Sequence, residues 1–199
     1  FMNGVIFTDG NNACCIASIT ESGTQGRISG TQLDNGSYRT MSISGIVVAS
    51  GANKACGIIG YAEKNVSVSG IIAAGNFASN DVLSLLTAAR NGNTAALVTL
   101  WDGAIGYSIY DGSLKGSSLS TANSKDNIAI TDGALILGSI ALGGGVNNLT
   151  VESGARIFGN ITATTLNLTF ELTELQDGPA ISTQSAGALN SAGTLFTIN

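Results

Sequence analysis

Charged side chains are scarce in this chain of 199 residues, which contains no histidine and a single proline. Lys, Arg, Asp and Glu make up 11 % of the sequence, against about a quarter in ordinary globular domains. The net charge is −5 and the basic residues form no cluster, which argues against nucleic-acid binding. Because histidine and a Cys-x-x-Cys pair are absent, we expect no zinc site, no Ser-His-Asp triad and no cofactor.

Long apolar runs are also missing, although hydrophobic residues make up 44 % of the chain. No run approaches the roughly 18 residues that a membrane-spanning helix needs, so we expect no membrane insertion by this segment. No secretory signal is visible at Phe1, and the opening "GVIFTDG" already lies within a pattern. We therefore expect the sequence to be a piece of a longer polypeptide.

Glycine is abundant, with 27 residues, and Ser, Thr and Asn together supply about 30 % of the positions. These residues are poor helix formers but suit strands and turns. The polar surface must consist largely of neutral hydroxyl and amide groups, and we expect an all-β fold.

A repeat of about 21 residues is visible in the second half of the chain. Residues 127–142 align with residues 148–163, and six of the sixteen positions are identical. Residues 107–114 align with residues 128–135 at the same shift, and residues 41–50 align with residues 66–75 at a shift of 25. In each unit apolar and polar residues alternate and a glycine follows, which is typical of a short half-buried strand and a corner.

Short strands that recur every twenty-odd residues indicate the rungs of a β-solenoid, in which neighbouring rungs share backbone hydrogen bonds and a core. We predict a single domain over residues 1–199 with about eight or nine rungs. A β-sandwich also uses many short strands, but it does not require matched apolar positions at a fixed period.

Residues 79–92 break this pattern. Asp81 lies where the first turn of a helix would be, apolar residues follow at helical spacing, and Gly92 can end the helix. We predict a short helix that interrupts the rungs, either as a lid over a gap in the solenoid or as a protruding recognition element.

The three cysteines are Cys14, Cys15 and Cys56, an odd number that argues against a disulfide scaffold. The separation between Cys14 and Cys56 corresponds to about two rungs and thus to about 9–10 Å, beyond the Cα range of a disulfide. We therefore predict that all three remain thiols. A bond between Cys15 and Cys56 would need the intervening chain to form one long rung.

Residues 127–142 and 148–163 resemble the passenger-domain repeats of Gram-negative autotransporters. Those repeats read apolar-x-apolar, then Gly-Ala, then apolar-x-Gly-x-apolar. The second copy fills the pattern with Leu149, Val151, Gly154, Ala155, Ile157, Gly159 and Ile161. The resemblance implies a right-handed parallel β-helix, export through the outer membrane and display at the bacterial cell surface, with a translocator outside this segment as the tether.

The favoured functional hypothesis is a surface adhesin or self-association module, whose polar ladders bind a second copy, a host surface protein or a glycan. The alternative is a structural stalk that carries a functional head elsewhere in the parent protein. A polysaccharide-degrading β-helix enzyme is disfavoured, because no rung brings two acids onto one strand face. We therefore expect no enzymatic activity.

Trp101, Tyr107 and Tyr110 are the candidate binding residues, since exposed aromatic rings beside Asp and Ser stack on sugars. In the alternative interpretation they cap the core where the predicted helix leaves it. Five Asp-Gly pairs are interpreted as turns, namely those at Asp9, Asp102, Asp111, Asp132 and Asp177, and a calcium-binding glycine repeat is absent.

Overall fold

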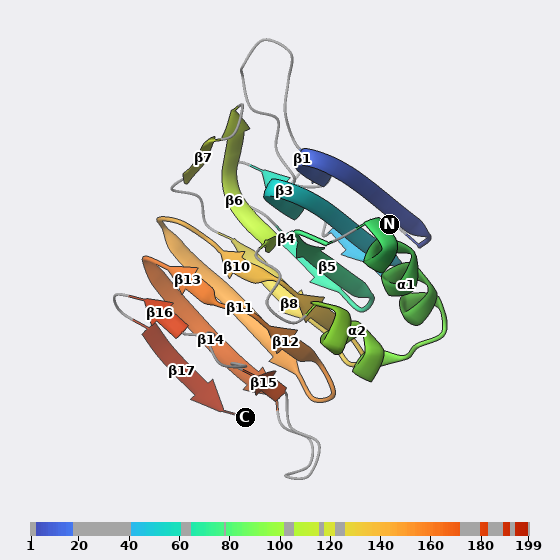
Figure 1. Ribbon diagram of the computed structural model, residues 1–199. Helices are drawn as coiled ribbons and strands as arrows, with labels where there is room; N and C mark the ends of the chain where they lie inside the picture. Colours follow the sequence, from blue (N-terminus) through green and yellow to red (C-terminus); the bar gives the residue numbers. More distant parts are fainter. Residues whose placement is uncertain are drawn as a thin grey trace, which may run out of the picture.

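The computed structural model describes residues 3–17, 41–60, 65–77, 79–101, 106–115, 118–121, 126–171, 180–182, 189–191 and 194–198. These residues form mostly parallel β-strands, with two helices at one side, in the arrangement of a parallel β-solenoid (Figure 1). The first and last strands lie at opposite ends of the stack.

One wall of the solenoid is a six-stranded parallel sheet in the order β17-β14-β11-β8-β4-β2. The strands of this sheet therefore lie side by side in the order in which they occur in the sequence, as expected for a coiled chain. The strands are β2 (Met41–Ile43), β4 (Asn65–Val68), β8 (Asn127–Ile130), β11 (Val146–Glu152), β14 (Thr165–Glu171) and β17 (Thr194–Ile198).

The other strands form an eleven-stranded sheet with two limbs, which join because β1 (Val5–Ala17) and β3 (Ile46–Gly60) run across both. The first limb continues from β3 through β5 (Ile71–Gly75), β9 (Leu135–Leu137), β12 (Arg156–Phe158) and β15 (Ala180–Ser182). The second limb continues through β6 (Tyr107–Lys115), β10 (Ser139–Ala141), β13 (Ile161–Ala163) and β16 (Leu189–Ser191), and β7 (Ser118–Thr121) pairs antiparallel with β6.

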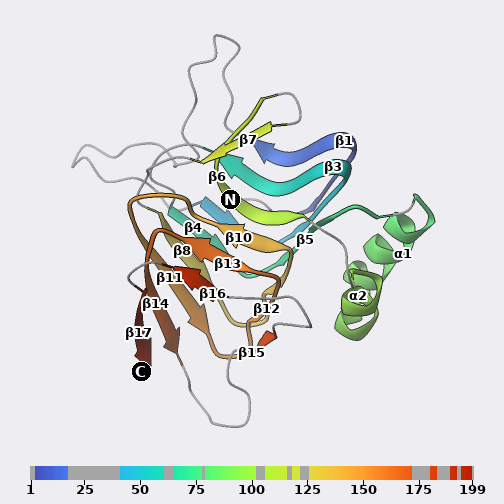
Figure 2. The ribbon, with the colours of Figure 1, turned by 60° about the vertical axis from the view of Figure 1, so that its left-hand side comes forward.

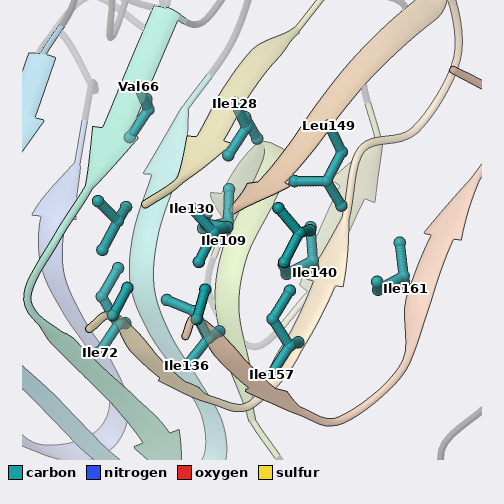
Figure 3. Close-up of a cluster of buried hydrophobic side chains, with 14 of the residues drawn as sticks. Val66, Ile72, Ile109, Ile128, Ile130, Ile136, Ile140, Leu149, Ile157 and Ile161 are labelled. Carbon is teal, nitrogen blue, oxygen red and sulfur yellow. The ribbon is translucent and has the colours of Figure 1, made fainter. Parts of the chain in front are cut away.

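Aliphatic side chains from all three walls fill the interior in columns (Figure 3). Each column stacks in-register residues of successive strands, so a coil buries its apolar positions against the same positions of the next coil. The columns include Val66, Ile128 and Leu149 from the six-stranded sheet, Ile72, Ile136 and Ile157 from the first limb, and Ile109, Ile140 and Ile161 from the second limb.

The strand register confirms two of the sequence repeats. Asn127 pairs with Asn148 and Ile140 with Ile161, which is the shift of 21, and Ile46 pairs with Ile71, which is the shift of 25. The third alignment, of residues 107–114 with 128–135, is wrong as a structural equivalence. Those residues of β6 pair with β3 and β10 in the second limb, whereas β8 belongs to the six-stranded sheet.

The coils differ greatly in length. Asn65 pairs directly with Asn127, so a single coil takes up the whole segment between them, including both helices. The described residues pass six times through the six-stranded sheet. The estimate of eight or nine rungs assumed a constant period, which these coils do not keep.

The predicted helix over residues 79–92 is confirmed by α1 (Ser79–Arg90), whereas α2 (Thr94–Trp101) was not predicted. The Asn93 side chain caps α2 by accepting a hydrogen bond from the Ala96 backbone N–H at 3.1 Å. Both helices lie beside the first limb (Figure 2) and pack on its outer apolar residues, which include Val48, Ala73, Leu137 and Phe158. They therefore cover an apolar sheet face and not a gap between rungs.

The predicted separation of two rungs between Cys14 and Cys56 is wrong, because the two residues are in register on the neighbouring strands β1 and β3. The segment between them forms one long coil, where the estimate assumed two. Cys15 and Cys56 carry thiols in the structure.

Candidate functional site

The outer surface of the six-stranded sheet carries neutral polar side chains in straight rows. Along β8 and β11 every second residue is buried, so Ile128, Ile130, Leu149 and Val151 face the core. The intervening residues face outward because side chains alternate across a strand. Register then aligns these outward residues from one strand to the next.

The first row, called the amide row, consists of Asn127, Asn148 and Asn167, which are in register, and the backbone of Asn65 continues this register. The Asn148 side-chain N–H donates to the Asn127 Oδ1 at 2.7 Å, and the Asn167 N–H donates to the Asn148 Oδ1 at 2.9 Å. An amide has two N–H donors and an oxygen with two lone pairs. With one ladder bond on each side, the half-exposed Asn148 amide keeps one N–H and one lone pair outside the ladder.

The second row lies two residues further along each strand and is called the hydroxyl row. It consists of Ser42, Ser67, Thr150 and Thr169, and Ala129 interrupts the hydroxyls between Ser67 and Thr150. Neighbouring strands are about 4.8 Å apart, so both rows repeat at this spacing. Together the amide row and the hydroxyl row form what we call the polar face, which consists of uncharged residues.

Asn147, next to the amide row, has a different role because its side chain points inward and is buried. Its Oδ1 accepts a hydrogen bond from the Asp126 backbone N–H at 3.0 Å. Its Nδ2 donates to the carbonyls of Leu142, Gly144 and Thr165 at 3.2–3.4 Å. One side chain thus ties together three successive coils where the chain enters β11.

The sequence interpretation did not single out Asn147. It has the same strand parity as the core residues Leu149 and Val151, and this inward parity is the signal that could have identified it. A polar residue at an inward position must find hydrogen-bond partners inside the protein.

Trp101, one of the candidate binding residues, is buried at the end of α2. Its indole N–H donates to the Ala74 carbonyl at 3.2 Å, and its ring lies 6.5 Å from that of Phe158 in a tilted arrangement. These contacts fasten α2 to the first limb. The expectation of an exposed ring is therefore wrong for Trp101, because the helix packs its apolar side against the sheet.

Tyr107 and Tyr110 lie in β6, in a different apolar cluster from Trp101. Their rings meet edge to face with centroids 5.0 Å apart. Tyr107 is half-buried, whereas Tyr110 is buried, so the expected exposure is wrong for Tyr110 as well. The structure thus brings the two tyrosines together and leaves Trp101 apart from them.

Burial raises the pKa of Tyr110 above its ordinary value, and the nearby Tyr107, Cys56 and Asp111 raise it further. Asp111 is itself buried within β6. The interpretation as a turn is wrong for the pairs at Asp111 and Asp9, since β6 and β1 run through them. The pairs at Asp102 and Asp177 lie outside the described residues. The Asp132 pair does form a turn, with Gly133 at a φ of 77°.

Among the described residues, no cluster of three or more His, Cys, Asp or Glu side chains could hold a metal ion. In the same part of the chain, neither helix is long and apolar enough to cross a bilayer. Comparisons of the chain with protein-family models, with curated proteins and with solved structures find no match.

Proposed function

We propose that this chain is part of a bacterial surface adhesin of the autotransporter-passenger kind and that its polar face makes the adhesive contact. The observation that carries the proposal is the amide row, in which Asn127, Asn148 and Asn167 are joined by hydrogen bonds and held in register. A partner that repeats its donors and acceptors along the solenoid meets the same groups on each coil. Many weak contacts then add up to avidity.

The composition supports contact between like surfaces. The polar face is uncharged, and the whole chain has a net charge of only −5, so two copies approach with little electrostatic repulsion. Two copies also have the same strand spacing, which allows their rows to match over several coils. We therefore favour self-association between cells over attachment to a host surface protein or glycan.

The proposed parent fold is a right-handed parallel β-helix, in which each passage through the six-stranded sheet is one rung. Crossover connections between parallel strands of one sheet are right-handed in nearly all proteins, which supports this hand. Secretion to the cell surface and a tether outside this segment belong to the same proposal.

The test is a clumping assay with particles that carry the chain on their surface. Replacing Asn148 and Thr150 with alanine removes one amide and one hydroxyl from the polar face and leaves Leu149 in the core. The matched control replaces the exposed Thr162 and Thr164, which lie outside the polar face. We expect clumping to fall for the first variant only.

A structural stalk is the alternative function, because a stack of coils that shares one core is also a suitable spacer. It predicts that particles coated with the original chain neither clump nor bind host cells, matrix or glycans. Equal clumping by the original chain and the polar-face variant would place the adhesive contact elsewhere on the molecule.

A further inference from the structure

Two of the three cysteines are brought together by the coil. Cys14 on β1 is the direct register partner of Cys56 on β3. Parallel strands lie about 4.7–4.9 Å apart, and disulfides form between Cα atoms about 4.4–6.8 Å apart. The pair therefore lies within the Cα range of a disulfide, although a long segment of sequence separates the two residues.

Cys15 is placed differently. Consecutive residues of a strand lie on opposite faces of the sheet, so Cys15 does not share a face with the register partner of Cys14. Its Sγ donates to the Val48 carbonyl at 3.1 Å and lies 3.3 Å from the Thr8 hydroxyl. The geometry thus distinguishes between two cysteines that are neighbours in the sequence.

We propose that Cys14 and Cys56 are a disulfide site, which covalently joins β1 to β3 when the chain meets a disulfide oxidant such as oxidised glutathione. One cysteine thiolate attacks the glutathione disulfide and releases one glutathione thiol, giving a mixed disulfide. The second cysteine thiolate then attacks the protein sulfur and releases the second glutathione. Two protein thiols are oxidised, and one glutathione disulfide is reduced to two thiols.

The bond forms before β1 docks or when β1 opens locally, because Cys56 is fully buried in the folded chain. Once formed, it closes a loop of about 40 residues and so restricts the unfolded chain. A loop of this size raises the melting temperature of a domain this large by about 10 °C. The cross-link does not depend on the adhesive role of the polar face.

The experiment refolds the full chain in a glutathione redox buffer, blocks the remaining thiols with an alkylating agent and measures the intact mass. We expect one alkylated thiol after oxidative refolding and three after treatment with a reductant. The oxidised chain should also migrate faster on a nonreducing gel and melt about 10 °C higher than the reduced chain.

Matched variants identify the bonded pair. Cys15→Ala should keep the cross-link and leave no thiol to alkylate, whereas Cys14→Ala should abolish it. Cys56 is left unchanged, because substituting its buried side chain would disturb the fold as well as remove the bond. Circular dichroism of the reduced variants checks that they fold. Three alkylated thiols in every redox buffer, or a cross-link that persists in Cys14→Ala, would overturn the proposal.

Discussion

Replacing Asn147 with alanine tests whether a single inward amide holds successive coils together. The side chain is fully buried and makes one hydrogen bond at 3.0 Å to the Asp126 N–H. It also makes three longer bonds of 3.2–3.4 Å to backbone carbonyls. Alanine removes all four and leaves a buried N–H without its acceptor.

The expected loss follows from these contacts. An unsatisfied buried donor costs about 1–3 kcal/mol, and a long hydrogen bond to a carbonyl contributes about 0.5 kcal/mol. The sum is about 3 kcal/mol of unfolding free energy, or a melting temperature lower by about 6–12 °C for a domain of this size.

Urea unfolding followed by circular dichroism measures this difference, provided that the slope of the free energy against urea is unchanged. The matched control is Asn148→Ala, since Asn148 is the next residue and its side chain lies in the half-exposed amide row. We expect the control to lose less than about 1 kcal/mol. Equal losses in the two variants, or a loss below about 0.5 kcal/mol for Asn147→Ala, would refute the role of the inward amide.

Three further predictions concern other parts of the fold. Gly70→Ala places a Cβ against the Gly45 backbone, so its unfolding free energy should fall by more than about 3 kcal/mol. The Cβ added by Gly92→Ala meets no atom, so this variant should lose only about 1–2 kcal/mol, because of the positive φ at this residue. Similar losses in the Gly70 and Gly92 variants would contradict the tight corner at Gly70. Trp101→Ala should lose about 3–5 kcal/mol and make the helices more sensitive to protease, whereas Trp101→Phe should lose about 1 kcal/mol. Because the pKa of Tyr110 in the folded chain is raised above 10.0, its neutral hydroxyl contributes fully to the unfolding free energy below pH 10. This contribution is lost as the pH rises through the folded pKa. Between pH 9 and 11 the urea midpoint of Tyr110→Phe should therefore fall less than that of the original chain. Identical falls would exclude Tyr110 as the cause of the lost stability.

The regular coils could be predicted from the sequence because nothing is inserted between their strands. Residues 127–142 and 148–163 align without a gap, and the same shift sets their strand register. A coil with short corners needs a fixed number of residues to return to its starting wall. Sequence period and structural period are then the same quantity.

Coils with insertions could not be predicted in this way. Residues 107–114 match residues 128–135 in sequence because strands of every wall alternate outward polar and inward apolar residues. This pattern does not identify the wall to which a strand belongs. The helices between β5 and β6 lengthen the coil that begins at β4, so a step of 21 residues back from β8 reaches β6 in the second limb and not β4. The same assumption of constant length placed Cys14 and Cys56 two rungs apart, although they are register partners.

The corner between the six-stranded sheet and the first limb explains why the polar face stays regular in spite of these insertions. In the coils from β2 to β12 this corner takes only two to four residues. Backbone hydrogen bonds connect it from coil to coil, for example from the Ile71 N–H to the Gly45 carbonyl at 2.9 Å and from the Leu135 N–H to the Gly70 carbonyl at 3.0 Å.

In the first two of these coils the corner requires glycine, because a Cβ on Gly45 or Gly70 would overlap the backbone of the preceding coil. The long connections leave from other corners, namely from β1 to β2 and from β5 to β6. Insertions there lengthen a coil without displacing the strands on either side of the glycine corner. A row such as Asn65, Asn127 and Asn148 can therefore remain in register across coils of very different length, which is the property that a repeating binding surface needs.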